Sequence, residues 1–314
     1  MNFRTEIKLE RLPVDWQIDY KKQLFLIGSC FSDNVGKLLK NFGFSAINNP
    51  FGTLYNPFSI CQNLDRLLQN IPFDDEDLIF SNGLWHSMSH HSFFSSEDKE
   101  LCLQNINKQF SIAQDSLLNA DFLFITFGSA WVFRWKESGE VVANCHKIPS
   151  KEFIREKLSV ECIVKRVEHT IQLFRQKNPT IKIVFSVSPI RHLGDGLHEN
   201  QLSKSTLLLA VDELCRQQNA IYFPSYEIVL DDLRDYRFFS DDMSHPSSFA
   251  VDYIWQKFSD CFFSEPTKQL LLRVEKLRKS LDHRPLNPNS KEYEKFLLAL
   301  ETEKEYLIKQ GIVI

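Results

Sequence analysis

Three residues of the 314-residue chain have side chains suited to nucleophilic catalysis: Ser29, Asp242 and His245. A serine hydroxyl becomes a nucleophile when an imidazole takes its proton, and a carboxylate can hold that imidazole in the required tautomer. Asp242 and His245 are three residues apart, so a single turn can bring the carboxylate to the ring. Because Ser29 lies near the other end of the sequence, the pattern predicts acyl chemistry only if the fold unites the three.

The position of Ser29 favours such a role. It follows Gly28 at the end of an apolar run over residues 23–27, and a helical pattern begins at residue 33 with Ser32 as the expected N-cap. Carboxyl ends of parallel strands bind ligands in open α/β sheets, and helix N-termini stabilise negative charge. Two plainer interpretations stay open: Ser29 is only a turn or capping residue, and Asp242 and His245 belong to a solvated acidic loop.

Apolar strand-like runs alternate with helical patterns, which is typical of βαβ units and a parallel sheet. The strands are expected at 23–27, 43–48, 121–126, 181–187 and 220–223, and the helices at 33–40, 59–69, 100–118, 160–175, 204–217 and 249–262. A β excursion is expected over 85–95 and a hairpin over 131–144. The pattern predicts a flavodoxin-like three-layer α/β/α fold with about five mostly parallel strands. It predicts a domain over 1–264 and a C-terminal helical extension over 265–314, packed on the core.

Composition narrows the function classes. The formal net charge is -4, so there is no basic footprint for nucleic acid. No apolar run reaches the roughly 20 residues that span a bilayer, and the first residues do not resemble a secretory signal, so we expect no membrane association and a cytoplasmic location. Seven widely spaced cysteines without a Cys-x-x-Cys pair predict reduced thiols. The oligomeric state stays open.

Residues 28–32, Gly-Ser-Cys-Phe-Ser, resemble the signature of the GSCFA family, which is related to the SGNH (GDSL-like) hydrolases. Further blocks resemble that family in the same order along roughly residues 24–250. They cover 49–57, 126–131, 142–147, 186–192 with Asn200 and Lys204, and 242–246. The resemblance implies an SGNH-type fold with Ser29 as nucleophile, His245 as base and Asp242 as the residue that orients the base.

The resemblance also implies an oxyanion hole built from the backbone N–H groups of Ser29 and Gly52. One block departs from the wider superfamily, because residues 128–131 read Gly-Ser-Ala-Trp where Gly-x-Asn-Asp would be expected. An asparagine donor is therefore missing, and loss of one such donor typically costs about 10²–10³ in rate. Asn144 and His192 are the candidates to replace it.

Four residues are expected to contact substrate: His91, Trp131, Arg191 and His192. Arg191 follows a predicted central strand, where a guanidinium could hold a carboxylate or phosphate of the substrate. The alternative for Arg191 is a salt bridge to Asp195 or Asp242.

Cys30 and a group of histidines are expected to have packing roles. Cys30 could act as a thiolate at a helix start, but the residue after Ser29 is expected to point elsewhere and pack. The histidines at 86, 90, 91 and 146 with Cys145 lack a zinc-ligand spacing, so neither a metal nor another cofactor is expected.

The hypothesis is a serine-dependent acyl esterase that works through an acyl-enzyme on a small-molecule or carbohydrate acyl ester, for example a carbohydrate O-deacetylase. A carbohydrate O-acetyltransferase on the same site is the first alternative. The second is a binding module that keeps the hydrolase shape without its chemistry, which the missing asparagine motivates.

Overall fold

The core is a five-stranded parallel sheet. The computed structural model describes residues 6–281 and 290–314. The strands are β1 (Gln23–Gly28), β2 (Ser45–Asn48), β5 (Phe122–Phe127), β9 (Lys182–Val187) and β10 (Ile221–Tyr222). Their order is β10-β9-β5-β1-β2, and every neighbouring pair is parallel. This is the flavodoxin-like order, so the predicted fold class is confirmed.

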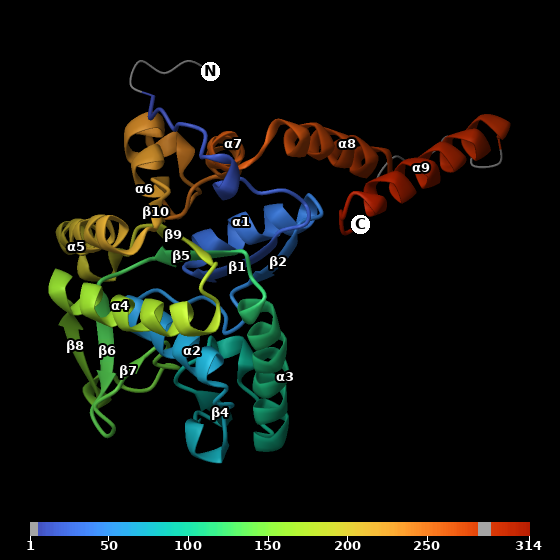
Figure 1. Cartoon of the computed structure of the whole chain (residues 1–314). Helices are drawn as coiled ribbons and strands as arrows, with labels where there is room; N and C mark the ends of the chain where they lie inside the picture. Colours follow the sequence, from blue (N-terminus) through green and yellow to red (C-terminus); the bar gives the residue numbers. More distant parts are fainter. Residues whose placement is uncertain (1–5, 282–289) are drawn as a thin grey trace.

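The sequences of the central strands are continuous apolar runs because helices pack on both faces of the sheet. Alternate residues along β1 point to opposite faces: Phe25 and Ile27 belong to one core cluster, and Leu24 and Leu26 to the other. The first cluster lies under α2 (Pro57–Gln69), α3 (Lys99–Leu118), α4 (Val160–Lys177) and α5 (Leu197–Gln218). The second lies under α1 (Cys30–Asn41) and α7 (Ser248–Phe262), which gives three layers (Figure 1).

Two small antiparallel sheets lie outside the central one. β3 (Leu78–Ser81) and β4 (Leu84–Ser87) form a hairpin, and β6 (Trp131–Trp135) pairs with β7 (Val141–Val142) and β8 (Phe153–Lys157). The hairpin expected over 131–144 is confirmed. Strand β8 was not predicted, because its Phe-Ile-Arg-Glu-Lys sequence carries charges and lacks a clear apolar alternation.

Two helix starts differ from prediction. Helix α1 begins at Cys30 with Ser29 as its N-cap, so the prediction of Ser32 as N-cap is wrong. The chain turns at once after β1 because Gly28 adopts φ +142°, and Ser32 is buried inside the helix. Helix α5 begins at Leu197 rather than at residue 204, because its first turns bury polar side chains that bond to the strand ends.

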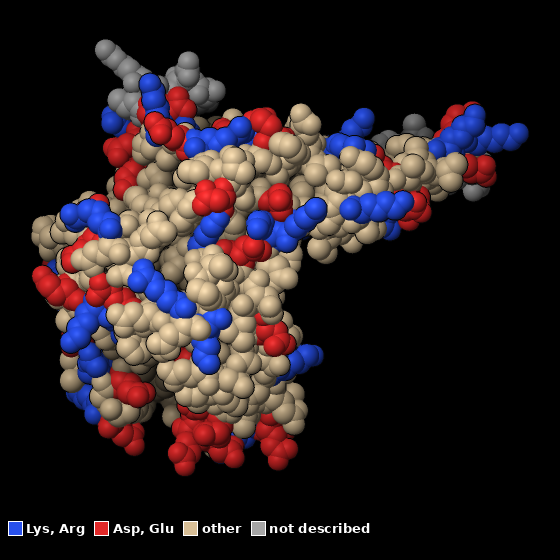
Figure 2. Space-filling model, in the orientation of Figure 1, with Lys and Arg blue, Asp and Glu red and all other residues tan. Residues whose placement is uncertain are grey.

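The chain after α7 forms α8 (Glu265–Leu281) and α9 (Lys291–Lys309), which extend from the body of the molecule (Figure 1). Their buried side chains, Val274, Leu277 and Leu307, join the core cluster under α1 and α7. Basic and acidic side chains alternate over these helices (Figure 2), and Arg273 pairs with Glu303 across them at 2.6 Å. The division into domains at residue 264 stays a prediction.

Short helical segments connect these elements. They are η1 (Val14–Trp16), η2 (Asp75–Asp77), η3 (Ser92–Phe94), η4 (Ser150–Glu152), η5 (Leu193–Asp195), α6 (Ser225–Glu227), the π-helical η6 (Ile228–Leu233) and η7 (Tyr236–Phe238). Among the described residues, no helix combines the length and apolar character needed to cross a bilayer.

Candidate functional site

Asp242 and His245 form a hydrogen-bonded pair. Oδ2 of Asp242 lies 2.5 Å from Nδ1 of His245, and Oδ1 accepts the backbone N–H groups of Ser244 and His245, each at 2.9 Å. These N–H donors and the ring hold the pKa of the Asp242 carboxyl well below its ordinary range. The carboxylate therefore stays charged and orients the ring. Nε2 of His245 has no hydrogen-bond partner among the residues that the structure describes.

The pair lies at the carboxyl edge of the central sheet. The Arg191 N–H donates to the Ser244 carbonyl at 3.1 Å, which ties the loop carrying Asp242 and His245 to the segment after β9. Ser29 directly follows β1, and β1 and β9 both pair with β5. The three residues thus belong to one edge of the sheet. Within the described residues no hydrogen bond joins the Ser29 hydroxyl to the His245 ring.

Ser29 occupies the switch point of the sheet, between β1 and β5, and its side chain is 0% exposed. Its hydroxyl accepts the Phe31 N–H at 3.3 Å, and its own N–H donates to the Thr126 carbonyl at 3.1 Å. A Cβ on Gly28 would lie 2.1 Å from that same carbonyl oxygen, so a side chain does not fit before Ser29. The backbone around Ser29 therefore fixes the position of its hydroxyl, and the surrounding protein shields this hydroxyl from solvent.

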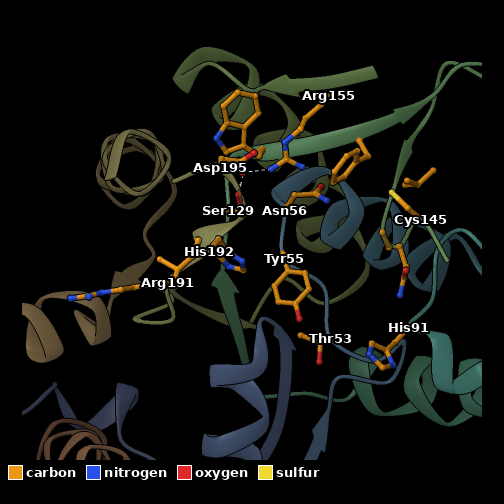
Figure 3. Close-up of a pocket in the computed structure, with 17 residues that line it drawn as sticks. Thr53, Tyr55, Asn56, His91, Ser129, Cys145, Arg155, Arg191, His192 and Asp195 are labelled. Carbon is orange, nitrogen blue, oxygen red and sulfur yellow. Dashed lines mark hydrogen bonds and ion pairs between the residues drawn. The ribbon is translucent and has the colours of Figure 1, made fainter. Parts of the chain in front are cut away.

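A cavity of about 580 Å³ opens at the same edge (Figure 3). Its walls come from the segment after β2, the segment after β5, the sheet β7-β6-β8 and residues 191–195. Ser29 does not line it. Tyr55 does, and its hydroxyl lies 3.4 Å from the Sγ of Cys30, the neighbour of Ser29. Tyr55 therefore connects the cavity wall to the turn that holds the serine.

His192 lies in that wall, and its ring points toward Tyr55 (Figure 3). The two rings meet edge to face at a centroid distance of 5.1 Å. Nε2 of His192 is buried and has no hydrogen-bond partner, while the backbone N–H is held by the Asn200 side chain at 2.9 Å. Burial, with the charges of Lys204, His245 and Arg155, lowers the pKa of His192 to about 3. The imidazole is therefore neutral at pH 7.

Lys204 was not assigned a site role from the sequence. It is 0% exposed, and its Nζ donates to the carbonyls of Gly128 at 2.6 Å and Ser188 at 2.8 Å. It thereby joins the segments that follow β5 and β9. Leu207 and Val211 lie on the same face of α5 and are buried. Their spacing from Lys204 is the sequence pattern from which a buried position of this lysine could have been predicted.

The three predicted oxyanion donors each have an acceptor within the protein. The Ser29 N–H is bonded to Thr126, the Gly52 N–H donates to the Asn49 carbonyl at 2.8 Å, and the Asn144 amide donates to the Ser92 hydroxyl at 3.0 Å. The two backbone N–H groups are therefore occupied in this structure, whereas the Asn144 amide, which has two N–H donors, uses one of them for Ser92. The oxyanion role of all three stays a prediction.

The four predicted substrate contacts all line the cavity: His91, Trp131, Arg191 and His192. The guanidinium of Arg191, however, extends away from the other labelled side chains (Figure 3) and lies 4.4 Å from the ring centroid of Phe239. Asp195 pairs with Arg155 and Asp242 with His245, so the predicted alternative of a salt bridge from Arg191 to either aspartate is wrong. The guanidinium instead lies over the rings of Tyr236 and Phe239, where cation–π attraction stabilises its charge.

His86, His90 and His146 of the histidine cluster pack as buried rings. His86 stacks on His146 at 4.4 Å, and the Ser87 hydroxyl and carbonyl bond to His90 and His146, each at 2.8 Å. Burial lowers the pKa of His90 to about 3 and that of His146 to about 4. No group of three or more His, Cys, Asp or Glu side chains in the described ranges is arranged to hold a metal ion.

Solved structures with low similarity to this chain include two esterases. A carbohydrate esterase family 3 protein from Talaromyces cellulolyticus matches with 8% identity and a TM-score of 0.36, over 81% of this chain and 99% of that one. An acetyl xylan esterase from the rumen bacterium Butyrivibrio proteoclasticus matches with 11% identity and a TM-score of 0.38, over 86% of this chain and 66% of that one. Scores this low carry no information on the chemistry of the chain.

No curated protein matches the sequence. Two family models do: the GSCFA family over residues 23–258, and the GSCFA domain protein, C-terminal domain, over residues 274–310. The first match spans the whole central sheet, Ser29 and the Asp242–His245 pair. This chain belongs to the GSCFA family.

Proposed function

We propose that the chain is a serine-dependent acyl esterase, with Ser29 as nucleophile, His245 as base and Asp242 as the residue that orients His245. The observation that supports this most is the 2.5 Å contact between Asp242 and His245, which leaves Nε2 of the ring without a partner among the described residues. The same sheet edge carries Ser29 at the start of a helix, where positive dipole favours a developing oxyanion.

In the proposed reaction, Ser29 Oγ attacks the ester carbonyl carbon while its proton passes to Nε2 of His245. The tetrahedral intermediate then collapses, the bond to the alcohol oxygen breaks, and His245 gives its proton to the departing alcohol. Water attacks the acyl-enzyme with His245 again as base, which releases a carboxylic acid and restores Ser29. The hydroxyl accepts the Phe31 N–H at 3.3 Å, which leaves its own O–H free to donate to His245 once the ring and the hydroxyl come together.

A second candidate is a binding module without esterase activity. The 0% exposure of Ser29 favours it, because a covered hydroxyl cannot meet a carbonyl unless neighbouring side chains move. The two candidates differ in one measurable property, which is covalent reaction at Ser29.

The test uses a fluorophosphonate probe on the full chain, with peptide mapping and hydrolysis of 4-nitrophenyl acetate. We expect labelling of Ser29 that Ser29→Ala abolishes and that Ser32→Ala, a buried serine of the same helix, retains. Asp242→Asn should lower kcat by about 10⁴, because the ring loses its orienting charge. A folded wild type that neither labels nor hydrolyses the ester would favour the binding module.

The acyl substrate is proposed to be a small acyl ester of a carbohydrate, as the family resemblance suggests. Released acetate from an acetylated oligosaccharide, measured with and without a second sugar acceptor, separates the deacetylase from an O-acetyltransferase. Acetate release that is independent of acceptor supports the esterase, and acetylation of the acceptor supports transfer.

A further inference from the structure

Two of the buried polar atoms without a hydrogen-bond partner belong to residues that line the cavity: Nε1 of Trp131 and Nε2 of His192. A buried polar group without a partner costs about 1–3 kcal/mol, so each such atom calls for a physical explanation. Trp131 lies on β6, with Arg155 and Lys157 over its ring, in the wall formed by the antiparallel sheet. His192 follows β9 of the central sheet, and its ring contacts Tyr55, whose hydroxyl lies beside Cys30.

The unpartnered nitrogen of His192 is located beside the strand that neighbours Ser29. A Cβ built on Gly128 would lie 3.2 Å from Nε2 of His192 and 3.2 Å from Cδ1 of Tyr55. Gly128 directly follows β5, and Thr126 of β5 accepts the Ser29 N–H. Because Gly128 has no side chain, the edge of the His192 ring that carries Nε2 has room beside it. This place is next to the switch point of the sheet.

Neighbouring residues position the backbone of His192 and one edge of its ring. Asn200 bonds its backbone N–H, Tyr55 meets its ring edge to face, and Lys204 ties both Ser188 and Gly128 to α5. The buried Nε2 at the cavity wall therefore has room for a hydrogen-bond partner that is not part of the protein.

Among the candidate donors, His192 differs in having no acceptor. The N–H groups of Ser29 and Gly52 and the amide of Asn144 all donate within the protein. Burial, with nearby positive charge, lowers the pKa of His192 and keeps its imidazole neutral at pH 7. In the tautomer with the proton on Nε2, the ring can donate a hydrogen bond without adding a charge.

We infer that His192 donates a hydrogen bond from Nε2 to the acyl oxygen of the ligand, and thereby stabilises the oxyanion when Ser29 attacks. This inference rests on the proposed function for its catalytic part. Binding of the acyl oxygen itself does not require the reaction. The roles proposed for Ser29, His245 and Asp242 stay the same.

Admission of the acyl group requires that a covering side chain move, because Nε2 of His192 and the Ser29 side chain are both buried. Tyr55 contacts the His192 ring and the Cys30 thiol at once, and it lines the cavity. Tyr55 is therefore the cavity-lining side chain in contact with both the His192 ring and the residue next to Ser29.

The catalytic test compares His192→Leu, which removes the donor, with His192→Gln, whose amide can donate. We expect kcat for 4-nitrophenyl acetate to fall by about 10²–10³ in His192→Leu, and the glutamine variant to recover at least about tenfold of this loss. His198→Leu, an exposed histidine of α5, is the matched control and should retain full activity. Activity in His192→Leu equal to that of the wild type would overturn the inference and leave the esterase proposal intact.

A second measurement does not depend on catalysis. The imidazole nitrogen resonances of the wild type and of Ser29→Ala are followed by NMR during titration with acetate, and the His192 signal is assigned by its loss in His192→Gln. We expect saturating acetate to shift Nε2 of His192 in both proteins. If the wild type proves inactive, this shift still supports the contact with an acyl oxygen, and its absence overturns the inference.

Discussion

At the scale of single residues, buried polar side chains hold together the segments at the carboxyl edge of the sheet. Lys204 is the clearest case, because its ammonium has no exposure and two backbone carbonyls as acceptors. Burial lowers the pKa of Lys204 to about 7 from an ordinary value of 10.5, since removing an ammonium from water disfavours its charged form. The two carbonyls act in the opposite direction by bonding to the ammonium.

This shift predicts a dependence of stability on pH. Between pH 7 and about 10.5 the unfolded chain keeps the Lys204 proton that the folded chain has lost, so the free energy of unfolding rises with pH. Below pH 7 both states are protonated and the contribution is constant. From pH 7 to pH 9 the wild type should gain about 2 kcal/mol relative to Lys204→Met.

Urea unfolding at the two pH values, followed by tryptophan fluorescence, measures the difference. Lys165→Met on the exposed side of α4 controls for the loss of any lysine. A gap between wild type and Lys204→Met that does not change with pH would mean that the carbonyls keep Lys204 charged throughout the range.

At the scale of elements, the turn between β1 and α1 determines where the serine lies. The strand ends at a glycine whose φ is +142°, and the helix starts two residues later with Ser29 as its cap. This turn is tight because the backbone of β5 passes directly beside it. The position of the Ser29 hydroxyl is therefore a property of two strands and a helix together.

Gly28→Ala tests this geometry. The added Cβ would meet the Thr126 carbonyl oxygen at 2.1 Å and would force an unfavourable φ, so we expect a loss of at least about 3 kcal/mol in stability. Gly139→Ala is the matched control, because its φ is +72° but its surroundings are open, and it should lose only about 1 kcal/mol. Equal losses in urea unfolding would show that the contact with β5 is unimportant.

At the scale of the whole molecule, the C-terminal helices share the core of the sheet domain. Leu307 of α9 is 0% exposed and belongs to the cluster that also contains Phe31 and Val35 of α1. The Val313 N–H donates to the Gly43 carbonyl at 2.8 Å, next to β2. Stability of the sheet and of the C-terminal helices should therefore be coupled.

Leu307→Ala measures this coupling. Removing a fully buried leucine typically costs about 2–5 kcal/mol, and we expect the whole protein to unfold earlier in one transition. Leu298→Ala on the same helix, 72% exposed, should change stability by less than about 0.5 kcal/mol. A separate early transition, with the sheet unfolding as in the wild type, would instead support an independent C-terminal unit.

The sequence alone was enough to predict the five strands of the central sheet and the helices between them, although not strand β8. Apolar runs such as 121–126 and helical faces such as that of α4 have periods that neighbouring residues set. The sequence also indicated the Asp242–His245 contact, which lies within one turn. Only the tertiary structure decided the burial of Ser29, the two backbone carbonyls that bond to Lys204, the contact of Arg191 with Phe239 and the unpartnered nitrogen of His192. Each of these depends on atoms from strands and loops far apart in the chain, and such distances leave no periodic trace in the sequence.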